Sequence, residues 1–369
     1  MLKVTIHIPA SPTVSPVLIE SGLIRKAEQY LAPALKGRKG ALITDARVWK
    51  LYRNHLRDSL NVPGSVIHPF PVPEGEKSKS LSQVQELAAG LAQKGFDRGD
   101  TVIALGGGLI LDLAGFLASV YMRGISYTSI PTTLLAQADA CIGGKVGVNY
   151  ANGRNLLGSF HHPHMVLVDP EVLDTLEKRD IRSGLGEVVK TALIGDKRLF
   201  ACFEEEPDIF SGSWKDFAED IIMRALRVKQ HIIEKDEKER GPRMALNLGH
   251  TVGHALETAT DYKLLRHGES VVVGILVASV ISKRRGLLSS ESFKRIAHVI
   301  TRIFPGKQWK NVANGTILKA LKLDKKKRRG RVPFVLPKRI GETVILWDVD
   351  HREIRKALDE VRNYDPGNI

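Results

Sequence analysis

Three histidines and one glutamate in the second half of the chain have the residue types and spacing of a metal site. His250 and His254 are four residues apart in NLGHTVGHALE, and His267 follows after a short interval. Glu187 lies upstream in GLGEVVK, three residues before Lys190. One carboxylate with two or more histidines can form a catalytic zinc site that leaves one position open for substrate. On spacing alone, His250 and His254 are the expected pair, because residues at i and i+4 share a helix face.

Arg243 and Asn247 extend this pattern toward the N-terminus. Together with His250 and His254 they occupy positions i, i+4, i+7 and i+11, which predicts a polar stripe along one face of a continuous helix. Burying four polar residues is costly unless they bind something, and a solvent-exposed stripe is the alternative. Two glycines interrupt the same segment, and glycine in a helix needs a reason such as the close approach of a ligand or backbone. The stripe therefore favours a binding site.

A glycine-rich turn in the first half of the chain has the pattern of a nucleotide site. The apolar run TVIAL at 101–105 leads into three glycines at 106–108, and an apolar helical pattern follows at once. Glycines let backbone N–H groups approach a pyrophosphate, and the helix N-terminus favours its charge. The turn departs from G-x-G-x-x-G because Leu111 occupies the third glycine position. Asp112, in the helix that follows, could reach a ribose hydroxyl or a metal-bridging water, or only stabilise the helix dipole.

Three more charged residues are candidates for nucleotide contacts. Asp45 follows the strand-like run GALIT, where acidic residues often bind ribose hydroxyls, although capping the next helix is the alternative. Glu76 and Lys79 lie in the polar segment 71–80, where they would contact the adenosine ribose or remain solvated. These alternatives stay open at the level of the sequence.

Two further glycine-rich turns suggest a second anion site. The turns at 143–145 and 153–155 each present a cation, and both follow the nucleotide segment closely. The formal net charge of +14 reflects either a solvated basic surface or attraction of an anion. Aromatic residues make up only 6% of the chain, and we find no zinc-finger spacing or RNA-binding aromatic motif. We therefore expect a small anionic substrate and no nucleic-acid partner.

The predicted elements divide the chain into two domains. Residues 1–170 alternate strand-like and helix-like segments, and they predict a Rossmann-like α/β dinucleotide-binding domain. Within it, a helical segment at 23–31 is expected to end at Pro33. Residues 171–369 predict a mainly α-helical, metal-binding domain. Its helical spacing occurs at 181–194, 217–235, 244–258 and 270–286.

Other features of the sequence indicate the compartment in which the protein acts. No apolar run is long enough for a membrane span, and the N-terminus lacks the pattern of a signal peptide. Cys141 and Cys202 are too few for a disulfide framework, which favours a reducing, cytoplasmic compartment. The basic run DKKKRRGR at 324–331 is expected to be a solvated loop.

Taken together, these motifs resemble the 3-dehydroquinate synthases, which are sugar-phosphate cyclases of the shikimate pathway in aromatic amino-acid biosynthesis. The resemblance rests on GGGLILDLAGFLASVYMRG, PTTLLAQADACIGGKVGVN, GRNLLGSF, GLGEVVK, KDEKERGPRMALNLGHTVGHALE and HGESV. It implies a lyase that uses NAD and Zn²⁺ or Co²⁺ to convert 3-deoxy-D-arabino-heptulosonate 7-phosphate into 3-dehydroquinate and phosphate. The implied steps are transient oxidation, β-elimination, reduction, ring opening and intramolecular aldol closure.

The resemblance also implies a role for each matching position. The metal would be held by Glu187, His250 and His267, which makes His254 a substrate-binding residue instead of half of a helical pair. The implied NAD-binding positions are Asp45, Glu76, Lys79, Gly107, Gly108, Asp112, Thr132, Thr133, Lys145 and Arg154. The implied substrate-binding positions are Arg123, Lys145, Asn155, Lys229, Arg243, Asn247, His254, Lys325 and Lys326. The implied catalytic positions are Asp139, Lys145, Asn155, Lys190 and His254.

Two of these assignments bear on partners and specificity. Arg123 is expected to help from a neighbouring subunit, which favours a homodimer. Lys229 and Arg243 are expected to bind a substrate carboxylate, which argues against a related cyclase acting on a neutral sugar phosphate. A metal-dependent polyol dehydrogenase is a second alternative, and a nucleic-acid-binding protein is a third.

Three positions depart from the family pattern. Arg154 stands where lysine is usual, Cys141 replaces a common serine, and Gly186 replaces a common alanine. None of the three removes a group that the implied chemistry needs.

Overall fold

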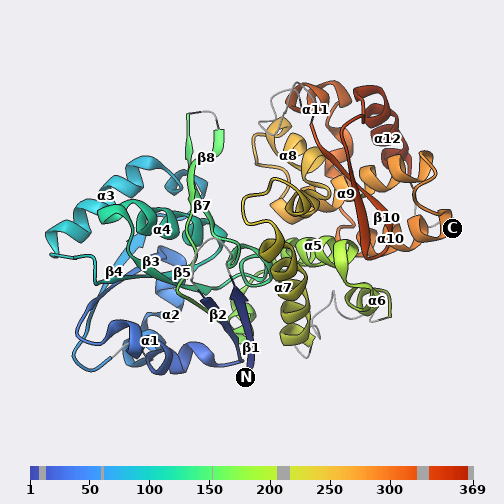
Figure 1. Ribbon diagram of the computed structural model, residues 1–369. Coiled ribbons are helices and arrows are strands. Elements are labelled where there is room, and N and C mark those ends of the chain that lie inside the picture. The colour runs from blue at the N-terminus through green and yellow to red at the C-terminus, as the bar shows by residue number, and fades with distance from the viewer. Residues whose placement is uncertain (8–13, 60–61, 152, 206–216, 322–331, 365–369) are drawn as a thin grey trace. The chain divides into compact units, whose positions relative to one another are not determined.

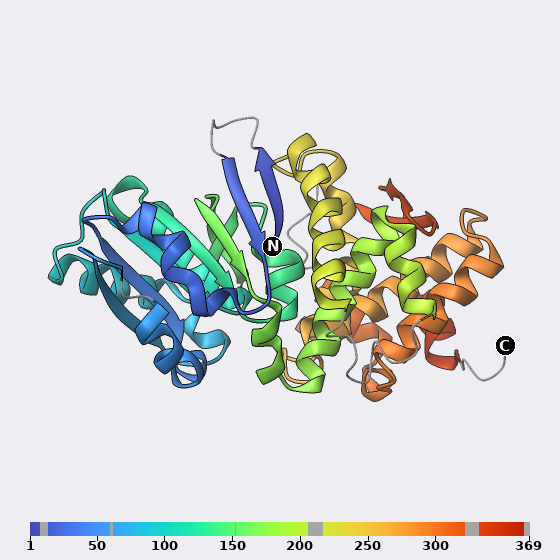
Figure 2. The same ribbon diagram turned by 90° about the horizontal axis from the view of Figure 1, so that it is seen from below.

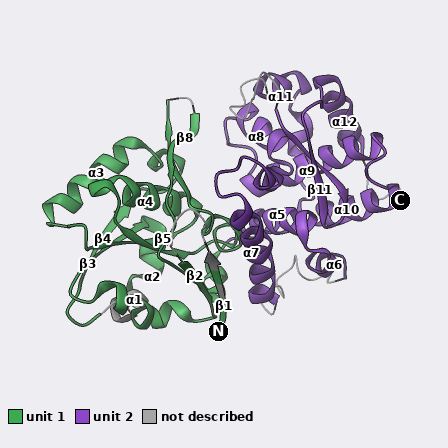
Figure 3. Cartoon of the chain, in the orientation of Figure 1, with its two compact units in different colours: residues 1–176 green, residues 177–369 purple. Residues whose placement is uncertain are grey.

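The computed structural model describes residues 1–7, 14–59, 62–151, 153–205, 217–321 and 332–364 (Figure 1). The chain divides into two compact units, Met1–Leu176 and Glu177–Ile369 (Figure 3). None of the helices in these ranges combines the length and apolar character that crossing a membrane requires.

The first unit is built on a sheet that is parallel except at one edge. Among the described residues, seven strands run in the order β1-β2-β9-β6-β5-β3-β4, and the β1–β2 pair is antiparallel. These strands are β1 (Leu2–His7), β2 (Val14–Ile19), β3 (Lys39–Asp45), β4 (Val66–Val72), β5 (Thr101–Gly106), β6 (Ser126–Pro131) and β9 (Met165–Val168). The central strand β5 is buried throughout, as expected for an apolar run with helices on both faces of its sheet.

Helices cover both faces of this sheet. They are α1 (Ala27–Leu35), α2 (Ala46–Ser59), α3 (Leu81–Gln93) and α4 (Gly108–Val120). Figures 1 and 2 show α3 and α4 on one side of the strands and α1 and α2 on the other. The order of strands and helices is that of a parallel α/β domain, which confirms the predicted fold class for this half.

The prediction that Pro33 ends the first helix is wrong. Pro33 lies inside α1, which continues to Leu35. Leu31 and Leu35 are both fully buried in the core of the unit. Proline removes one backbone hydrogen bond, but continuing the helix buries Leu35, and that apolar contact offsets the loss.

A separate hairpin lies between β6 and β9 in the chain. It consists of β7 (Lys145–Tyr150) and β8 (Gly153–Phe160), and its register shifts between Val148 and Tyr150. Gly143 and Gly144 form a true turn, with φ values of 98° and 65°. The segment 153–155 is not a second turn of this kind, because Gly153 pairs with Tyr150 and begins β8.

The second unit is mostly helical, as predicted. Its helices are α5 (Lys178–Gly195), α6 (Lys197–Glu205), α7 (Ala218–Lys235), α8 (His250–Ala259), α9 (His267–Arg284), α10 (Ser290–Ile303), α11 (Asn314–Leu321) and α12 (His351–Asn363). Every residue from Gly268 to Ser282 is buried, and α5, α8, α10 and α12 all pack against α9. A hairpin that the sequence analysis missed, β10 (Phe334–Arg339) with β11 (Glu342–Leu346), also contacts this central helix.

The predicted continuous helix through Arg243 and His254 is wrong. The 3₁₀ helix η8 (Pro242–Asn247) ends first, and α8 begins only at His250. Gly249 separates them with a left-handed φ of 77°. A Cβ atom at this position would overlap the carbonyl oxygen of Val271 in α9. Close packing against α9 thus requires glycine here, and the four polar residues do not form one helical stripe.

Candidate active site

Two helices of the second unit approach closely beside Glu187 and His267. Gly268, the second residue of α9, lies against α5, and a Cβ atom there would overlap the carbonyl oxygen of Ser183. A Cβ atom on Gly186 would lie 2.6 Å from the carbonyl oxygen of Gly268. Ser183 Oγ also accepts a hydrogen bond from Gly268 N at 3.0 Å. This contact brings the residues that adjoin the glycines, Glu187 and His267, together.

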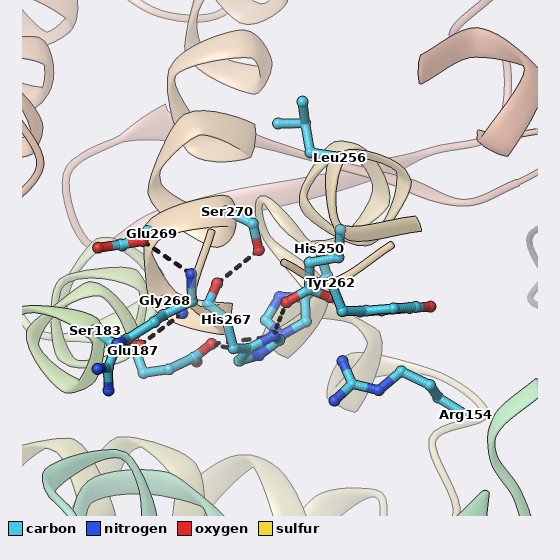
Figure 4. A network of polar contacts seen from close by, with 12 residues as sticks. Arg154, Ser183, Glu187, His250, Leu256, Tyr262, His267, Gly268, Glu269 and Ser270 are labelled. Atoms are coloured by element: carbon cyan, nitrogen blue, oxygen red, sulfur yellow. Dashed lines mark hydrogen bonds and ion pairs between the residues drawn. The ribbon is translucent and has the colours of Figure 1, made fainter. Parts of the chain in front are cut away.

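Glu187, His250 and His267 point toward one another in Figure 4. Glu187 Oε1 lies 3.5 Å from His250 Nε2 and 3.2 Å from His267 Nε2. This oxygen is buried without a hydrogen bond of ordinary geometry from the described residues. A buried carboxylate oxygen facing imidazole nitrogens fits a cation, and these are donor atoms that Zn²⁺ and Co²⁺ accept.

Hydrogen bonds orient both imidazole rings. His267 Nδ1 lies 2.9 Å from Glu257 Oε1, and His250 Nδ1 lies 3.2 Å from the carbonyl oxygen of Leu248. With a proton on each Nδ1, both Nε2 lone pairs face Glu187. Glu257, which is almost completely buried, was not among the residues identified from the sequence. Its position two helical turns after His250 was the available signal.

Lys190 and the imidazoles control the charge on Glu187. Lys190 Nζ forms an ion pair with Glu187 Oε2, and both side chains are buried. Burial alone would raise the pKa of Glu187, but the ammonium of Lys190 and the two imidazoles hold it well below its usual range. Burial alone would lower the pKa of His267, but Glu187 and Glu257 raise it to about 10. The surroundings therefore favour positive charge beside Glu187, whether it is a proton or a metal ion.

His254 belongs to the same cluster. Ligand nitrogens of His250, His254 and His267 all lie within 4.8 Å of one another. The ring of His254 is edge-on to that of His250 and stacked on that of His267, at centroid distances of 5.1 Å and 5.7 Å. This geometry is compatible with His250 and His254 as a metal-binding pair, as expected from their spacing. It is equally compatible with Glu187, His250 and His267, the ligands that the resemblance implies. The role of His254 in binding substrate stays a prediction.

An acidic loop positions the predicted anion-binding residues of this unit. Asp236 accepts hydrogen bonds from the backbone of Arg240, Gly241 and Arg243 at 2.9, 2.7 and 3.1 Å. The side chain of Arg243 is almost fully buried and donates to the carbonyl oxygen of Glu237. Asp236 was not identified from the sequence, because its hydrogen bonds depend on the folded conformation of the loop between α7 and η8.

Two further predicted substrate-binding residues, Lys229 and Asn247, lie on α7 and η8, which contact each other. Lys229, on α7, is 7% exposed. The Asn247 side chain donates to Glu239 Oε1 and, at 3.2 Å, to the carbonyl oxygen of Met244. Glu239 is a further polar residue that was not identified from the sequence.

In the first unit, the glycine turn has the geometry expected of a helix N-terminus that binds anions. Gly107 is the N-cap in extended conformation, and α4 begins at Gly108. A Cβ atom on Gly107 would lie 3.1 Å from Thr133 Cγ2, so the two predicted positions are adjacent. Thr132 N donates to the carbonyl oxygen of Gly106 at 2.9 Å. Leu111, at the third glycine position, is buried inside the first turn of α4.

Four of the charged residues predicted to bind NAD form two ion pairs. Lys79 Nζ contacts Asp112 Oδ2, and the Lys79 side chain is nearly buried. Arg154 donates to Glu76 Oε1 from Nε at 3.0 Å. Asp45 accepts from Val48 N at 2.8 Å, so its capping of α2 is observed. Its ribose contact stays a prediction.

The remaining predicted residues of the first unit lie around irregular backbone. Asp139 is in the π-helical turn η4 (Ala136–Ala140), a kind of irregularity that is frequent at functional sites. Lys145 lines a small cavity together with Asp112. Asn155 and Arg123 have left-handed φ values of 48° and 70°, and Arg123 is exposed. Lys325 and Lys326, together with the whole basic run 324–331, lie outside the described residues.

Solved structures of other enzymes share this architecture. 2-epi-5-epi-valiolone synthase from Streptomyces hygroscopicus subsp. jinggangensis 5008, solved with NAD⁺ and Zn²⁺, matches with a TM-score of 0.85 and 30% identity, covering 95% of this chain and 97% of that one. A 2-deoxy-scyllo-inosose synthase complexed with carbaglucose-6-phosphate, NAD⁺ and Co²⁺ gives a TM-score of 0.86 at 23% identity, covering 98% and 99%. The fold is therefore that of the sugar-phosphate cyclases.

Sequence comparison identifies the family within this class. Models described as 3-dehydroquinate synthase N-terminal and C-terminal match residues 69–183 and 184–327. The 3-dehydroquinate synthase of Desulforamulus reducens is 36% identical over 357 residues, covering 96% of this chain and 99% of the relative. That of Solibacter usitatus is 40% identical over 342 residues, covering 92% and 94%. This chain belongs to the 3-dehydroquinate synthase family, which confirms the resemblance found in the sequence.

Proposed function

We propose that this enzyme converts 3-deoxy-D-arabino-heptulosonate 7-phosphate into 3-dehydroquinate and inorganic phosphate. The observation that carries the proposal is the buried cluster of Glu187 with His250 and His267, in a chain that matches the family over nearly its whole length. The family gives the reaction, and the cluster supplies the metal-binding chemistry that such a reaction needs. The enzyme is accordingly a phosphate-eliminating carbon–oxygen lyase.

The proposed cofactors are NAD and Zn²⁺ or Co²⁺. The valiolone synthase with 30% identity was solved with NAD⁺ and Zn²⁺, which supports the same pair here. When bound, NAD reversibly accepts hydride from a carbon bearing a hydroxyl, and the divalent ion makes that hydroxyl more acidic. The glycine turn before α4 is the proposed pyrophosphate site, and Glu187, His250 and His267 are the proposed metal ligands.

The chain's own residues then bind the substrate and handle protons. Lys145, Asn155, Asn247 and His254 are proposed to bind the phosphate, with a lysine of 325–326 in the same role. Charge-assisted hydrogen bonds stabilise the phosphate as it leaves, and the phosphate's own oxygens serve as the base for the elimination. Asp139 and Lys190 are proposed to lie near the reacting hydroxyls.

Lys229 and Arg243 are the proposed basis of substrate specificity. Both are almost fully buried, with exposed fractions of 7% and 2%. Buried cations are stable when an anion is close to them, and a substrate carboxylate supplies that anion. A substrate without a carboxylate would place no negative charge beside these cations and would gain no charge-assisted hydrogen bond from them. The proposal therefore favours the heptulosonate over a neutral sugar phosphate.

We also propose that the enzyme is a homodimer that acts in the cytoplasm. Val120 and Met122, beside exposed Arg123, leave 48% and 41% of their surface exposed, which suits a protein interface. Among the described residues, neither Cys141 nor Cys202 forms a disulfide bond, which supports a reducing compartment.

A comparison of phosphate release from different sugar phosphates tests the proposed function. Purified enzyme with NAD and Zn²⁺ should release phosphate from the heptulosonate, and glucose 6-phosphate or sedoheptulose 7-phosphate should release far less. Arg243→Gln should lower kcat/KM for the heptulosonate by about tenfold to a hundredfold, because one charge-assisted hydrogen bond to the substrate is lost. Phosphate release from the other two sugars, but not from the heptulosonate, would contradict the proposal and favour a different cyclase.

A further inference from the structure

Asn149 lies where several segments of the first unit meet. Its backbone N–H donates to the carbonyl oxygen of Lys79 at 2.9 Å, and it forms an isolated parallel bridge with Ser80. Its side-chain Nδ2 donates to Glu76 Oε1 at 2.8 Å. Its Oδ1 accepts from the backbone N–H of Asn155 at 3.0 Å. A single amide therefore connects the 3₁₀ turn η2 (Glu76–Ser78) with the start of β8.

The local backbone explains why Asn149 can make these contacts. Val148 pairs with Leu157 in the β7–β8 hairpin and Tyr150 pairs with Gly153, so the register shifts at Asn149. Irregularities of this kind release a residue from the ladder and redirect its side chain. The backbone N–H of Asn149 is thereby available to a different segment, and its side chain reaches two others.

Each side-chain contact serves a residue with a proposed role. Asn155 has a left-handed φ of 48°, which is uncommon for a residue other than glycine, and the hydrogen bond to Asn149 holds its N–H in that backbone conformation. Glu76 accepts from Arg154 as well as from Asn149. Burial raises the pKa of Glu76, but the hydrogen bond from Asn149 and the positive charges of Arg154 and Lys79 lower it overall. Asn149 therefore helps to keep Glu76 ionised.

We propose that Asn149 is a positioning residue that couples the cofactor site to the substrate site. The inference rests on the proposed function, in which Glu76 and Arg154 bind NAD and Asn155 binds the substrate. The amide is suited to this because it donates to the carboxylate of Glu76 and simultaneously accepts from the backbone of Asn155. A carboxylate at this position would only accept, and an apolar side chain of similar size would do neither.

Two variants separate the two contacts. Asn149→Leu removes both hydrogen bonds and keeps the side-chain size. Asn149→Asp keeps the acceptor for Asn155 N–H but places a second carboxylate beside Glu76. Ser159→Ala is the matched control, because it removes a 2.7 Å hydrogen bond to Ser119 Oγ from the same hairpin, outside this network. Three measurements apply to each protein: NAD affinity by calorimetry, KM for the heptulosonate at saturating NAD, and hydrogen exchange of the Asn155 amide.

The expected results differ between the variants. Asn149→Leu should weaken NAD binding and raise KM, each by about tenfold, and should speed exchange at Asn155. Asn149→Asp should weaken NAD binding to a similar extent but leave KM and Asn155 exchange close to wild type. Ser159→Ala should change none of the three. An equal rise in KM in the two variants, or wild-type NAD affinity in Asn149→Asp, would overturn the proposal.

A failure of the proposed function would look different. If wild-type enzyme binds NAD but releases no phosphate, the reaction is wrong, and NAD affinity and amide exchange still test the network. If the wild type binds no NAD, the cofactor assignment fails and the coupling proposal fails with it. Exchange at Asn155 would then report only the local backbone conformation.

Discussion

At the scale of single residues, the candidate site depends on how polar atoms are oriented. Glu187 offers one oxygen to Lys190 and the other to His250 and His267. Glu257 in turn fixes the ring of His267. Such outer contacts set the tautomer and basicity of a ligand, so they influence metal affinity without touching the metal.

Glu257→Gln should therefore weaken metal binding while leaving the fold intact. The amide oxygen of glutamine still accepts from His267 Nδ1, but the negative charge that makes the imidazole more basic is lost. We expect a loss of about tenfold to a hundredfold in Zn²⁺ affinity, measured by competition with a chromophoric chelator. Thr258→Ala, on the exposed side of α8, is the control and should bind Zn²⁺ like the wild type. Unchanged affinity in Glu257→Gln would show that Glu257 has no such role.

The loop around Asp236 makes the free energy of unfolding depend on pH. Burial raises the pKa of Asp236, but hydrogen bonds from the backbone of Arg240, Gly241 and Arg243 lower it overall. A carboxylate whose pKa is lower in the folded state stabilises the protein above its unfolded pKa. That contribution is lost as pH falls through the folded value.

Asp236→Asn should consequently cost about 1 kcal/mol of unfolding free energy at pH 7, and less as the pH falls below the ordinary pKa of an aspartate. Denaturant unfolding of both proteins across this pH range measures the difference. A difference that stays constant, or grows toward low pH, would contradict the assignment of a lowered pKa to Asp236.

At the scale of elements, close helix packing brings the metal ligands together. The α5–α9 contact depends on Gly268, whose α carbon lies against the backbone of Ser183. The left-handed Gly249 similarly lets α8 begin beside α9. Both glycines allow backbone approaches that any side chain would prevent.

Gly268→Ala should therefore damage the site and the fold together. The added Cβ atom meets rigid backbone, so we expect destabilisation of about 3 kcal/mol or more and loss of tight Zn²⁺ binding. Gly315→Ala in α11 is the control, because nothing lies within 4 Å of the position that its Cβ atom would occupy. It should be neutral or slightly stabilising. Thermal unfolding and Zn²⁺ titration of the two variants check this, and a stable, zinc-binding Gly268→Ala protein would contradict it.

At the scale of the whole molecule, local patterns predicted the broad organisation. The strand–turn–helix at the glycines, the helical second half and the residues Glu187, His250 and His267 were all identifiable from the sequence. What could not be predicted depends on tertiary contacts. The expected helix ends at Gly249 because α8 packs closely against α9. Helix α1 continues beyond Pro33 because Leu35 is buried in the core. Glu257 orients a metal ligand only because His267, from a different helix, lies beside it.

The division of proposed sites between the units gives a further prediction. All proposed NAD contacts lie in Met1–Leu176, and the proposed metal ligands lie in Glu177–Ile369. Because a ligand stabilises the structure that binds it, NAD should slow hydrogen exchange mainly in the first unit and Zn²⁺ mainly in the second. At a hundredfold excess over Kd, the stabilisation should be about 2.7 kcal/mol. Zn²⁺ protection confined to the first unit would contradict the assignment of the ligands.

The central claim is that the enzyme uses NAD without net oxidation and eliminates phosphate. The most direct test follows phosphate and NADH together in one reaction containing the heptulosonate, NAD and Zn²⁺. The account predicts phosphate and 3-dehydroquinate in equal amounts, many turnovers for each NAD, and no steady rise in NADH absorbance. NADH that accumulates with substrate consumption while no phosphate is released would contradict it and would indicate a polyol dehydrogenase instead.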